Sequence, residues 1–342
     1  MTRRTALTLA AAGAAVRGDN KPPIGIGFLG ASHSHAEGKL AVVRAAPQDW
    51  KILGVCESDP KLQEAIRKEG IPLLGREELL KHPDIRAIAV ESAVRDHATD
   101  GLAVLQAGKH LHLEKAPADS MTGFEKIVAL AREKRLLLQV GYMWRYHPAI
   151  GAAMEAARNG WLGSVYLVKA TIGNQLAPKR RPEWAEFAGG NMFELGGHVI
   201  DPMIRLMGKP KDVKSILRKD GNFDDTLKDN TLAIFQWDKA LGIVHGSNLQ
   251  PGSSRYRAFE VHGTNGAAIV NPIEPPVLTI DLDKPAGPYS KGVQKVPVPS
   301  YERYAGDMVE LAAAVRGEKK LRVTYDEDLM VQEALLRASG MY

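Results

Sequence analysis

The sequence lacks three features that would point to common classes of protein. Its 342 residues contain one cysteine, Cys56, which excludes an intrachain disulfide framework and any multi-cysteine zinc or iron–sulfur site. No apolar run approaches the ~20 residues that a membrane-spanning helix requires. There is no internal repeat, and no stripe of basic and aromatic residues of the kind that nucleic-acid binding needs. We therefore predict no membrane span, no nucleic-acid partner and no cysteine-based cofactor.

The overall composition is typical of a globular protein. Hydrophobic residues make up 44% of the chain and charged residues 25%, and the formal net charge is +5. A chain of 342 residues is long for a single core, so its length predicts about two domains.

The first 17 residues have the pattern of a targeting signal rather than of a domain. Arg3 and Arg4 precede an acid-free stretch, Ala6 to Val16, which is too short for a bilayer but suits the apolar region of a signal peptide. The paired arginines resemble a twin-arginine leader, the signal for exporting a folded protein. We predict a signal peptide over residues 1–17 and export, for example to the periplasm. If the leader does not function, the protein is cytoplasmic and has an Ala-rich N-terminal extension.

The pattern from residue 20 to residue 143 alternates between strands and helices. Short apolar stretches read as buried strands, and helix-length segments separate them. This alternation predicts right-handed crossovers and a doubly wound, mostly parallel α/β sheet of the Rossmann type, the architecture of a nucleotide-binding domain. The predicted strands are 24–29, 51–56, 85–91, 110–113 and 136–140; the predicted helices are 36–45, 60–70, 97–107 and one that Thr122 and Glu125 begin as a capping box.

The turn after the first predicted strand is the candidate phosphate-binding loop. The first two glycines of the GxGxxG spelling that ends at Gly30 fall inside the strand, so that match is weak. If Gly30 instead makes the tight turn, the backbone N–H groups of Ser32, His33 and Ser34 could bind a pyrophosphate. Ser32 and His35 stand where further glycines are expected. An ordinary strand–helix turn with two solvent-facing histidines therefore explains the same residues.

An acidic residue, Glu57, follows the second predicted strand. A carboxylate at this position can accept hydrogen bonds from the ribose hydroxyls of an adenosine and repels a 2′-phosphate. Glu57 therefore favours NAD over NADP. The alternative is a surface carboxylate near the start of a helix, where the helix dipole also favours negative charge.

The second half of the chain predicts a different architecture. Consecutive strands joined by turn signals indicate an open antiparallel β-sheet, so this half reads as an α+β domain. The Pro-rich stretch 272–299 reads as an irregular surface excursion, and two helices follow it. The predicted strands are 165–172, 211–217, 231–237, 241–248, 256–263 and 267–270; the predicted helices are a short one after Pro148, 301–316 and 326–339.

Three segments carry the chemistry. Glu114-Lys115-Ala116-Pro117 follows the fourth strand and residues 141–148, GYMWRYHP, follow the fifth. Ligands of open α/β sheets bind beyond the carboxyl ends of the strands, so both segments lie at the expected crevice. The third segment, residues 189–201, begins a long helix. At helical spacing Glu194 and His198 share a face, with Asp201 three residues further along.

In this order the three segments resemble the Gfo/Idh/MocA family of sugar and cyclitol oxidoreductases. The family's Glu-Lys-Pro signature appears as Glu114-Lys115-Ala116-Pro117, with one residue inserted before the proline, and its Asp-x-Gly-x-His-x-x-Asp region matches 194–201 with Glu194 in the first position. The resemblance implies a Rossmann domain, placed at 20–143, and a substrate domain at 144–342 that includes the C-terminal helices. It also implies a homo-oligomer formed through the antiparallel sheet.

The resemblance assigns roles to individual residues. Lys115 would contact the reacting hydroxyl and the nicotinamide ribose, and His198 would be the general acid/base, with Glu194 in the place of its usual aspartate partner. Neutral imidazole has a suitable pKa for accepting a hydroxyl proton, and an ammonium stabilises developing alkoxide charge. Arg145 and Tyr146 would line the nicotinamide side of the cleft. Of two further acidic residues, Glu114 would bind the cofactor and Asp201 would bind the substrate.

These residues predict an NAD-dependent oxidoreductase that acts on a hydroxyl of a sugar or cyclitol. One alternative is a glycoside hydrolase or lyase that keeps NAD tightly bound and cleaves through a transient keto-sugar. Glu194 and His198 could hold a divalent metal in such a reaction, but two candidate ligands do not make a site, and we assign no metal ligand. A lesser alternative is a non-catalytic sugar sensor, which the presence of both Lys115 and His198 argues against.

Overall fold

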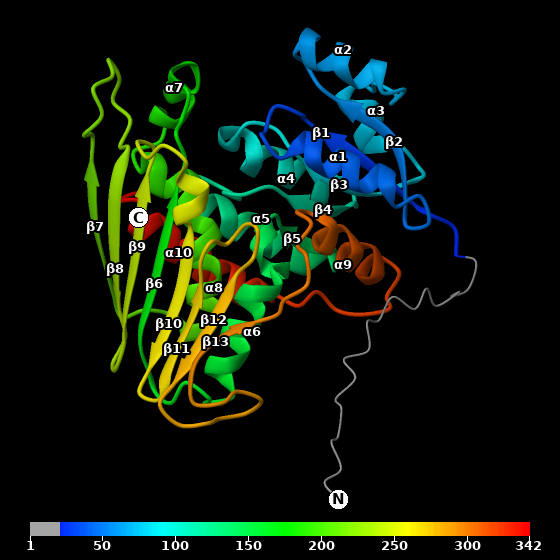
Figure 1. The fold of residues 1–342 in the computed structure, drawn as a ribbon. Coiled ribbons are helices and arrows are strands. Elements are labelled where there is room, and N and C mark those ends of the chain that lie inside the picture. Colours follow the sequence, from blue (N-terminus) through cyan, green and yellow to red (C-terminus); the bar gives the residue numbers. More distant parts are fainter. Residues whose placement is uncertain (1–20) are drawn as a thin grey trace, which may run out of the picture.

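The computed structural model describes residues 21–342, which form two β-sheets with helices around and between them (Figure 1). The first sheet is parallel throughout and has the strand order β2-β1-β3-β4-β5. Its strands are β1 Ile24–Leu29, β2 Trp50–Cys56, β3 Ile85–Val90, β4 His110–Leu113 and β5 Leu138–Val140. The predicted parallel, doubly wound sheet is therefore confirmed.

Helices cover both faces of the parallel sheet. The helices are α1 Ala36–Ala45, α2 Pro60–Lys68, α3 Arg76–Lys81, α4 His97–Gln106, α5 Met121–Lys134 and, from the far end of the chain, α9 Ala305–Val315. On one face, Phe28 of β1 packs with Leu40 of α1 and Leu311 of α9. On the other, Ile88 of β3 packs with Phe124 of α5. Burial on both faces explains why the strands read as continuous apolar runs.

One local prediction in this half was wrong, and one helix was missed. The capping residue of α5 is Ser120, whose side chain accepts a hydrogen bond from the Gly123 N–H, so Thr122 lies in the first turn and forms no capping box with Glu125. A serine two residues earlier competes successfully because its backbone is extended, as an N-cap requires. The short helix α3 was not predicted. The predicted start of α2 is confirmed, with Asp59 as the cap and Pro60 in the first position.

The second sheet has eight strands in the order β13-β12-β11-β10-β6-β9-β8-β7. The strands are β6 Val165–Gly173, β7 Asp212–Arg218, β8 Asn230–Gln236, β9 Leu241–Ser247, β10 Ala258–Gly263, β11 Gly266–Val270, β12 Leu278–Leu282 and β13 Gly292–Val296. Every neighbouring pair is antiparallel except β6 and β9, which are parallel. The sheet is therefore mixed, because the chain leaves β6, passes through helices and the β7–β8 hairpin, and returns beside β6 in the same direction.

The stretch 272–299 is not the irregular excursion that its prolines predicted. It contributes β12 and β13, which extend the sheet at one edge. All of its prolines lie outside these two strands, and β12 alternates buried Leu278, Ile280 and Leu282 with more exposed residues. The prolines thus bound the strands, where a missing N–H does not interrupt a ladder.

Helices fill the space between the two sheets. They are α6 Pro148–Arg158, α8 Gly197–Met207 and α10 Tyr325–Ala338, the last begun by a capping box of Thr324 and Glu327. The short helix α7 Arg181–Ala185 packs separately, with its Trp184 against Leu176 and Leu227. Figure 1 shows α6, α8 and α10 against the inner face of the second sheet. A single buried cluster joins the first sheet to the second through these helices. The long helix predicted from residue 189 begins with a π-helical turn, Met192–Gly196, before α8.

Two further predictions concern the ends and the boundary of the chain. In the part of the chain from residue 21 onward, no helix is long and apolar enough to cross a membrane. The predicted signal peptide, residues 1–17, lies outside the described residues. The predicted domain boundary at residue 143 stays a prediction. That boundary assigns α9 to the second domain, although α9 packs on the first sheet.

Candidate active site

The carboxyl ends of three neighbouring strands bring together the first group of polar side chains. The order β1-β3-β4 places the loop after β1 beside Glu91, which follows β3, and Glu114, which follows β4. The loop after β1 contains His33 and His35. This is the edge at which open α/β sheets bind their ligands.

A buried lysine bonds to both glutamates. The Nζ of Lys39, on α1, donates to Oε1 of Glu91 at 2.7 Å and to Oε1 of Glu114 at 2.7 Å, and all three side chains are fully buried. Burial raises the pKa of Glu91 to about 8, in spite of Lys39. Burial also opposes ionisation of Glu114, but Lys39, His35 and His33 outweigh it and hold the pKa of Glu114 well below its usual range. Glu114 is therefore a carboxylate at neutral pH.

The two histidines of the loop face this carboxylate. Nδ1 of His35 lies 3.0 Å from Oε1 of Glu114, and Nδ1 of His33 lies 3.6 Å from Oε2. The rings of His33 and His35 meet edge to face at 4.7 Å between centroids. Burial lowers the pKa of both imidazoles, so both are neutral at neutral pH. They are not the two solvent-facing histidines of an ordinary turn, because their side chains are only 7% and 12% exposed.

Lys115 joins the first sheet to the second half of the chain. Its Nζ donates to the backbone oxygen of Glu194 at 2.9 Å and to Oε2 of the same residue at 3.3 Å. Its backbone N–H donates to Oε2 of Glu114 at 2.7 Å. Burial raises the pKa of Glu194, although Lys115 opposes the shift. The two predicted catalytic residues Lys115 and Glu194 are therefore in direct contact.

His198 lies next to this pair in an aromatic environment. It is 2% exposed, and its ring centroid is 5.6 Å from that of His35 and 5.5 Å from the Trp144 ring. Its Nδ1 has no hydrogen-bond partner among the described residues. Burial, followed by the charge of His35, lowers its pKa well below the usual value. His198 is thus a neutral imidazole with one nitrogen free to take a ligand hydrogen bond.

The structure does not join Glu194 to His198 in the way that helical spacing predicted. In residues 21–342 the Glu194 side chain bonds to Lys115, and no hydrogen bond connects it to His198. Glu194 lies in the π-helical turn, whose hydrogen bonds run five residues back, so side chains four apart no longer lie one above the other.

Arg145 and Asp201, predicted to contact cofactor and substrate, are instead bonded to each other. Nε of Arg145 donates to Oδ1 of Asp201 at 2.9 Å, and the guanidinium also donates to Asp328 of α10. All three side chains are at most 2% exposed. Burial would lower the pKa of Arg145, but the two aspartates raise it, and Arg145 also lies 5.0 Å from the Tyr142 ring. This buried ion-pair cluster fastens the segment after β5 to α8 and α10.

Tyr146 is also engaged within the protein. Its hydroxyl donates to Glu310 of α9 at 2.6 Å and accepts from Nε2 of Gln139 at 3.0 Å. The Arg322 guanidinium covers its ring at 4.3 Å. In this structure the Tyr146 hydroxyl is thus satisfied by protein partners and holds α9 against β5.

The predicted phosphate loop has the tight turn that its glycine indicated. Gly30 has φ of +80°, and a Cβ at this position would lie 2.6 Å from the Ser92 backbone. The backbone N–H of His33 donates to the carbonyl of Glu91 at 3.0 Å, so it is occupied, whereas Ser32 and Ser34 are exposed.

Glu57 lies beside this turn, as predicted from its place after β2. Its Oε2 accepts from the Ala31 N–H at 2.6 Å, and its Oε1 accepts from the N–H groups of Ser58 and Asp59 at 2.7 and 2.9 Å. A carboxylate thus marks the point where the loops after β1 and β2 meet.

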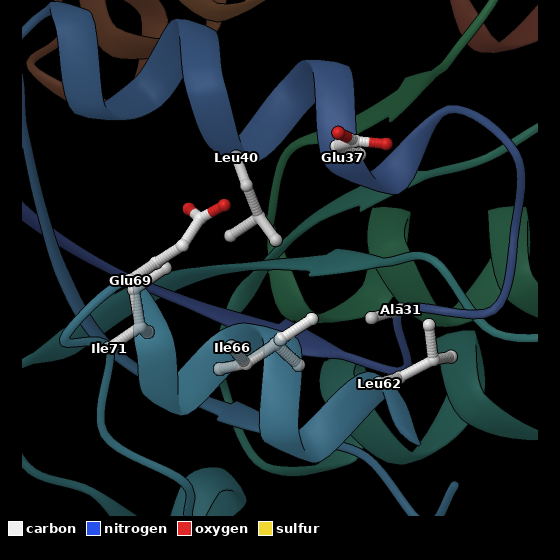
Figure 2. A pocket seen from close by; sticks show the side chains of 8 residues that line it. Ala31, Glu37, Leu40, Leu62, Ile66, Glu69 and Ile71 are labelled. Atoms are coloured by element: carbon white, nitrogen blue, oxygen red, sulfur yellow. The ribbon is translucent and has the colours of Figure 1, made fainter.

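A pocket of about 210 Å³ opens between α1 and α2, next to this point (Figure 2). Its apolar side chains include Leu40, Leu62 and Ile66, and Glu37 and Glu69 lie at its sides. Of the loop after β1, only Ala31 reaches it, so it is a neighbour of the candidate site and not its centre.

Lys39 and Glu91 are site residues that the sequence reasoning missed. A signal was present for Lys39, because Ala36, Lys39, Leu40 and Val43 follow helical spacing and all four are buried. A lysine on the apolar face of a helix needs a buried carboxylate partner. Nothing in the sequence indicates which carboxylate that is.

The parallel sheet, its phosphate-loop turn and a lysine at the end of β4 are features of dinucleotide-dependent oxidoreductases. Comparison with known families agrees: residues 24–142 match the family described as "Oxidoreductase family, NAD-binding Rossmann fold", and residues 150–269 match the GFO/IDH/MocA C-terminal domain. The chain therefore belongs to the GFO/IDH/MocA family of oxidoreductases.

Individual relatives show the range of activities in this family. The chain is 28% identical over 237 residues to trans-1,2-dihydrobenzene-1,2-diol dehydrogenase of Oryctolagus cuniculus, covering 67% of this chain and 70% of the relative. It is 25% identical over 196 residues to a scyllo-inositol 2-dehydrogenase (NADP(+)) of Bacillus subtilis, covering 56% and 54% of the two chains. These relatives are oxidoreductases, which does not support the hydrolase or lyase alternative.

Solved structures show the same fold. A levoglucosan dehydrogenase in complex with NADH and levoglucosan superposes with a TM-score of 0.78 at 19% identity, over 94% of this chain and 98% of that one. The predicted combination of a Rossmann domain with a second β-sheet domain is thereby confirmed.

Proposed function

We propose that this oxidoreductase transfers hydride between the nicotinamide of a bound dinucleotide and a hydroxyl-bearing carbon of a sugar, cyclitol or diol. The observation that carries the proposal is the convergence of Lys115 and His198 at the carboxyl edge of the parallel sheet. They come from the two halves of the chain and meet beside the loop after β1. The substrates named for the relatives are diols, an inositol and an anhydro-sugar, all with secondary hydroxyl groups.

In this proposal His198 accepts the proton of the substrate hydroxyl. Its neutral imidazole with an unpartnered Nδ1 has the required state and a free acceptor or donor position. Lys115 stabilises the developing alkoxide charge. To do so, its ammonium would exchange its bond to Glu194 for one to the substrate oxygen, while Glu194 remains nearby to compensate its charge.

The dinucleotide supplies the hydride acceptor when bound. Gly30, Ser32 and Ser34 would face the pyrophosphate through the backbone, and Glu57 would meet the adenosine ribose and repel a 2′-phosphate. To accept the ribose hydroxyls, Glu57 would share the oxygens that now accept from backbone N–H groups. We therefore propose NAD as the cofactor. One relative was solved with NADH and another is named for NADP(+), so the family's fold accommodates both.

The test uses purified untagged protein. Its bound nucleotide is identified after denaturation, and NAD⁺ and NADP⁺ reduction is then followed with levoglucosan, scyllo-inositol and trans-diols. We expect nicotinamide reduction with at least one of these compounds and a loss of about 10²–10⁴-fold in kcat/KM for His198→Asn. Lys115→Met should show a comparable loss, whereas Lys126→Met, on the exposed face of α5, should not. Absence of nucleotide binding, or turnover unchanged by both site variants, would contradict the proposal, and NADP specificity would refute the role of Glu57.

Oligomerisation through the second sheet is also proposed. Its outward face presents apolar side chains on adjacent strands: Ile234 of β8 is paired with Ile243 of β9, and Leu241 of β9 with Leu167 of β6. A second copy of the chain would cover them. Sedimentation analysis of the wild type and of Ile243→Lys tests this, because a dimer formed here should dissociate in the variant.

Export by the leader stays a prediction for residues 1–17. Cell fractionation of the full chain and of Arg3→Lys/Arg4→Lys tests it, since a twin-arginine signal should fail when both arginines are replaced.

A further inference from the structure

The histidines of the loop after β1 have no assigned role in hydride transfer. A sequence of the form His-x-His in a phosphate loop is unusual, because such a loop favours small residues that let a phosphate approach the backbone. His33 and His35 nevertheless both turn inward toward one carboxylate, that of Glu114. One ligand atom from each of His33, His35 and Glu114, a ring nitrogen or a carboxylate oxygen, lies within 4.8 Å of the other two.

We propose that His33, His35 and Glu114 bind a divalent transition-metal ion of the Zn²⁺ class, with one coordination position left open. Two neutral imidazoles and one carboxylate form a donor set that catalytic zinc sites use, with the fourth position for water or a ligand oxygen. The open position lies on the side of the imidazoles, because Glu114 has no exposed surface whereas both rings retain some. Glu91, His112 and Glu114 also lie close together. That second set is excluded because the Lys39 ammonium occupies the space between its two glutamates.

The spacing of the donor atoms agrees with tetrahedral coordination. Bonds of about 2.0–2.1 Å to nitrogen and oxygen place neighbouring ligand atoms about 3.3 Å apart at tetrahedral angles. The observed separations, 3.0 Å from Nδ1 of His35 to Oε1 of Glu114 and 3.6 Å from Nδ1 of His33 to Oε2, lie on either side of this value, and they end on the two different oxygens of the carboxylate.

The hydrogen bonds around the cluster show which lone pairs a metal ion would take. The backbone N–H of His35 donates to Nδ1 of His33 at 3.3 Å, so this nitrogen carries its lone pair and not a proton. The same nitrogen lies 3.6 Å from Oε2 of Glu114. An ion bound to both atoms would replace the hydrogen bond from the His35 N–H, because an imidazole nitrogen has one lone pair.

The surroundings of Glu114 suit a metal ligand. Oε1 accepts from Lys39 and lies against His35, whereas Oε2 accepts from the Lys115 N–H and has a second lone pair for a metal ion. Such outer partners orient a ligating carboxylate.

The experiment measures metal binding directly and does not depend on turnover. Untagged, chelator-treated wild type is titrated with Co²⁺, and the visible d–d absorption of low-symmetry Co²⁺ is recorded; bound Zn²⁺ is counted by elemental analysis after gel filtration. The test variant is His33→Gln/His35→Gln. The matched control is His82→Gln, on a partly buried histidine after α3 in the same half of the chain. Nucleotide binding is measured in every sample by NADH fluorescence, with and without chelator.

We expect one equivalent of Co²⁺ in the wild type and in the control, and an affinity at least about 100-fold weaker in the double variant. No stoichiometric uptake by the wild type, or uptake that the double variant retains, overturns the proposal. If the double variant does not fold, Glu114→Gln and the single His33→Gln decide by the same criterion. The proposed hydride transfer fails separately, through loss of NADH binding or turnover in samples that still bind the metal.

Discussion

Replacing Glu91 with glutamine should remove a pH-dependent loss of stability that the buried charge cluster imposes. One ammonium, Lys39, faces two buried carboxylates, Glu91 and Glu114. Oε1 of Glu91 accepts from Lys39 at 2.7 Å, but its Oε2 has no partner among the described residues. Burial therefore wins at Glu91 and raises its pKa to about 8, while Glu114 stays ionised. The Glu91→Gln amide oxygen can accept the same bond without a charge.

The direction of the effect follows from proton binding. Between an ordinary pKa of 4.5 and the folded-state pKa of about 8, folded Glu91 keeps a proton that the unfolded chain has released. The free energy of unfolding therefore falls as the pH rises through this window, by up to about 1.4 kcal/mol per pH unit. Between about pH 6 and pH 8 the loss from this one group is about 2 kcal/mol.

Urea unfolding followed by circular dichroism, at several pH values and with chelator present, measures the effect. The difference in unfolding free energy between Glu91→Gln and wild type should shift by about 2 kcal/mol in favour of the variant from about pH 6 to pH 8. Glu125→Gln changes an exposed side chain on α5, and its unfolding free energy should have the same pH dependence as that of the wild type. A pH-independent difference would refute the reasoning, because Glu91 would then be ionised in the folded protein throughout.

Three other substitutions test the remaining contacts. Lys39→Met leaves the buried Glu114 carboxylate without its cation and should cost about 3–5 kcal/mol of unfolding free energy at neutral pH; a loss below about 1 kcal/mol would show that the cluster is solvated. Arg145→Met should cost a similar amount by leaving Asp328 unpaired and Asp201 with only the Arg205 ion pair at 3.6 Å, and its thermal unfolding midpoint should fall even if NADH binding is unchanged. Gly30→Ala should weaken NADH binding, measured by fluorescence titration, because its Cβ would meet Ser92 at 2.6 Å with φ at +80°; unchanged affinity would contradict the assigned turn.

The local patterns of the sequence were sufficient for most of the first sheet. The apolar run of β1 and the start of α2 at Pro60 are short-range signals, and the structure agrees with them within a residue or two. The second sheet was predicted less well, since the parallel pairing of β6 and β9 depends on where a distant return of the chain comes to lie. The two strands within 272–299 were not predicted for a related reason. Whether such a segment forms a strand depends on the neighbouring strand with which it pairs, and the local sequence does not show that strand.

The sequence by itself determined the chemistry available at the site: a lysine after β4, a histidine at the start of α8, a carboxylate after β2 and a glycine turn. Which side chains bond to each other was decided only by the tertiary structure. Helical spacing paired Glu194 with His198, but a π-helical turn and the approach of Lys115 paired it with the lysine. Buried charges take whichever opposite charge the packing places within reach, and that neighbour comes from remote parts of the chain.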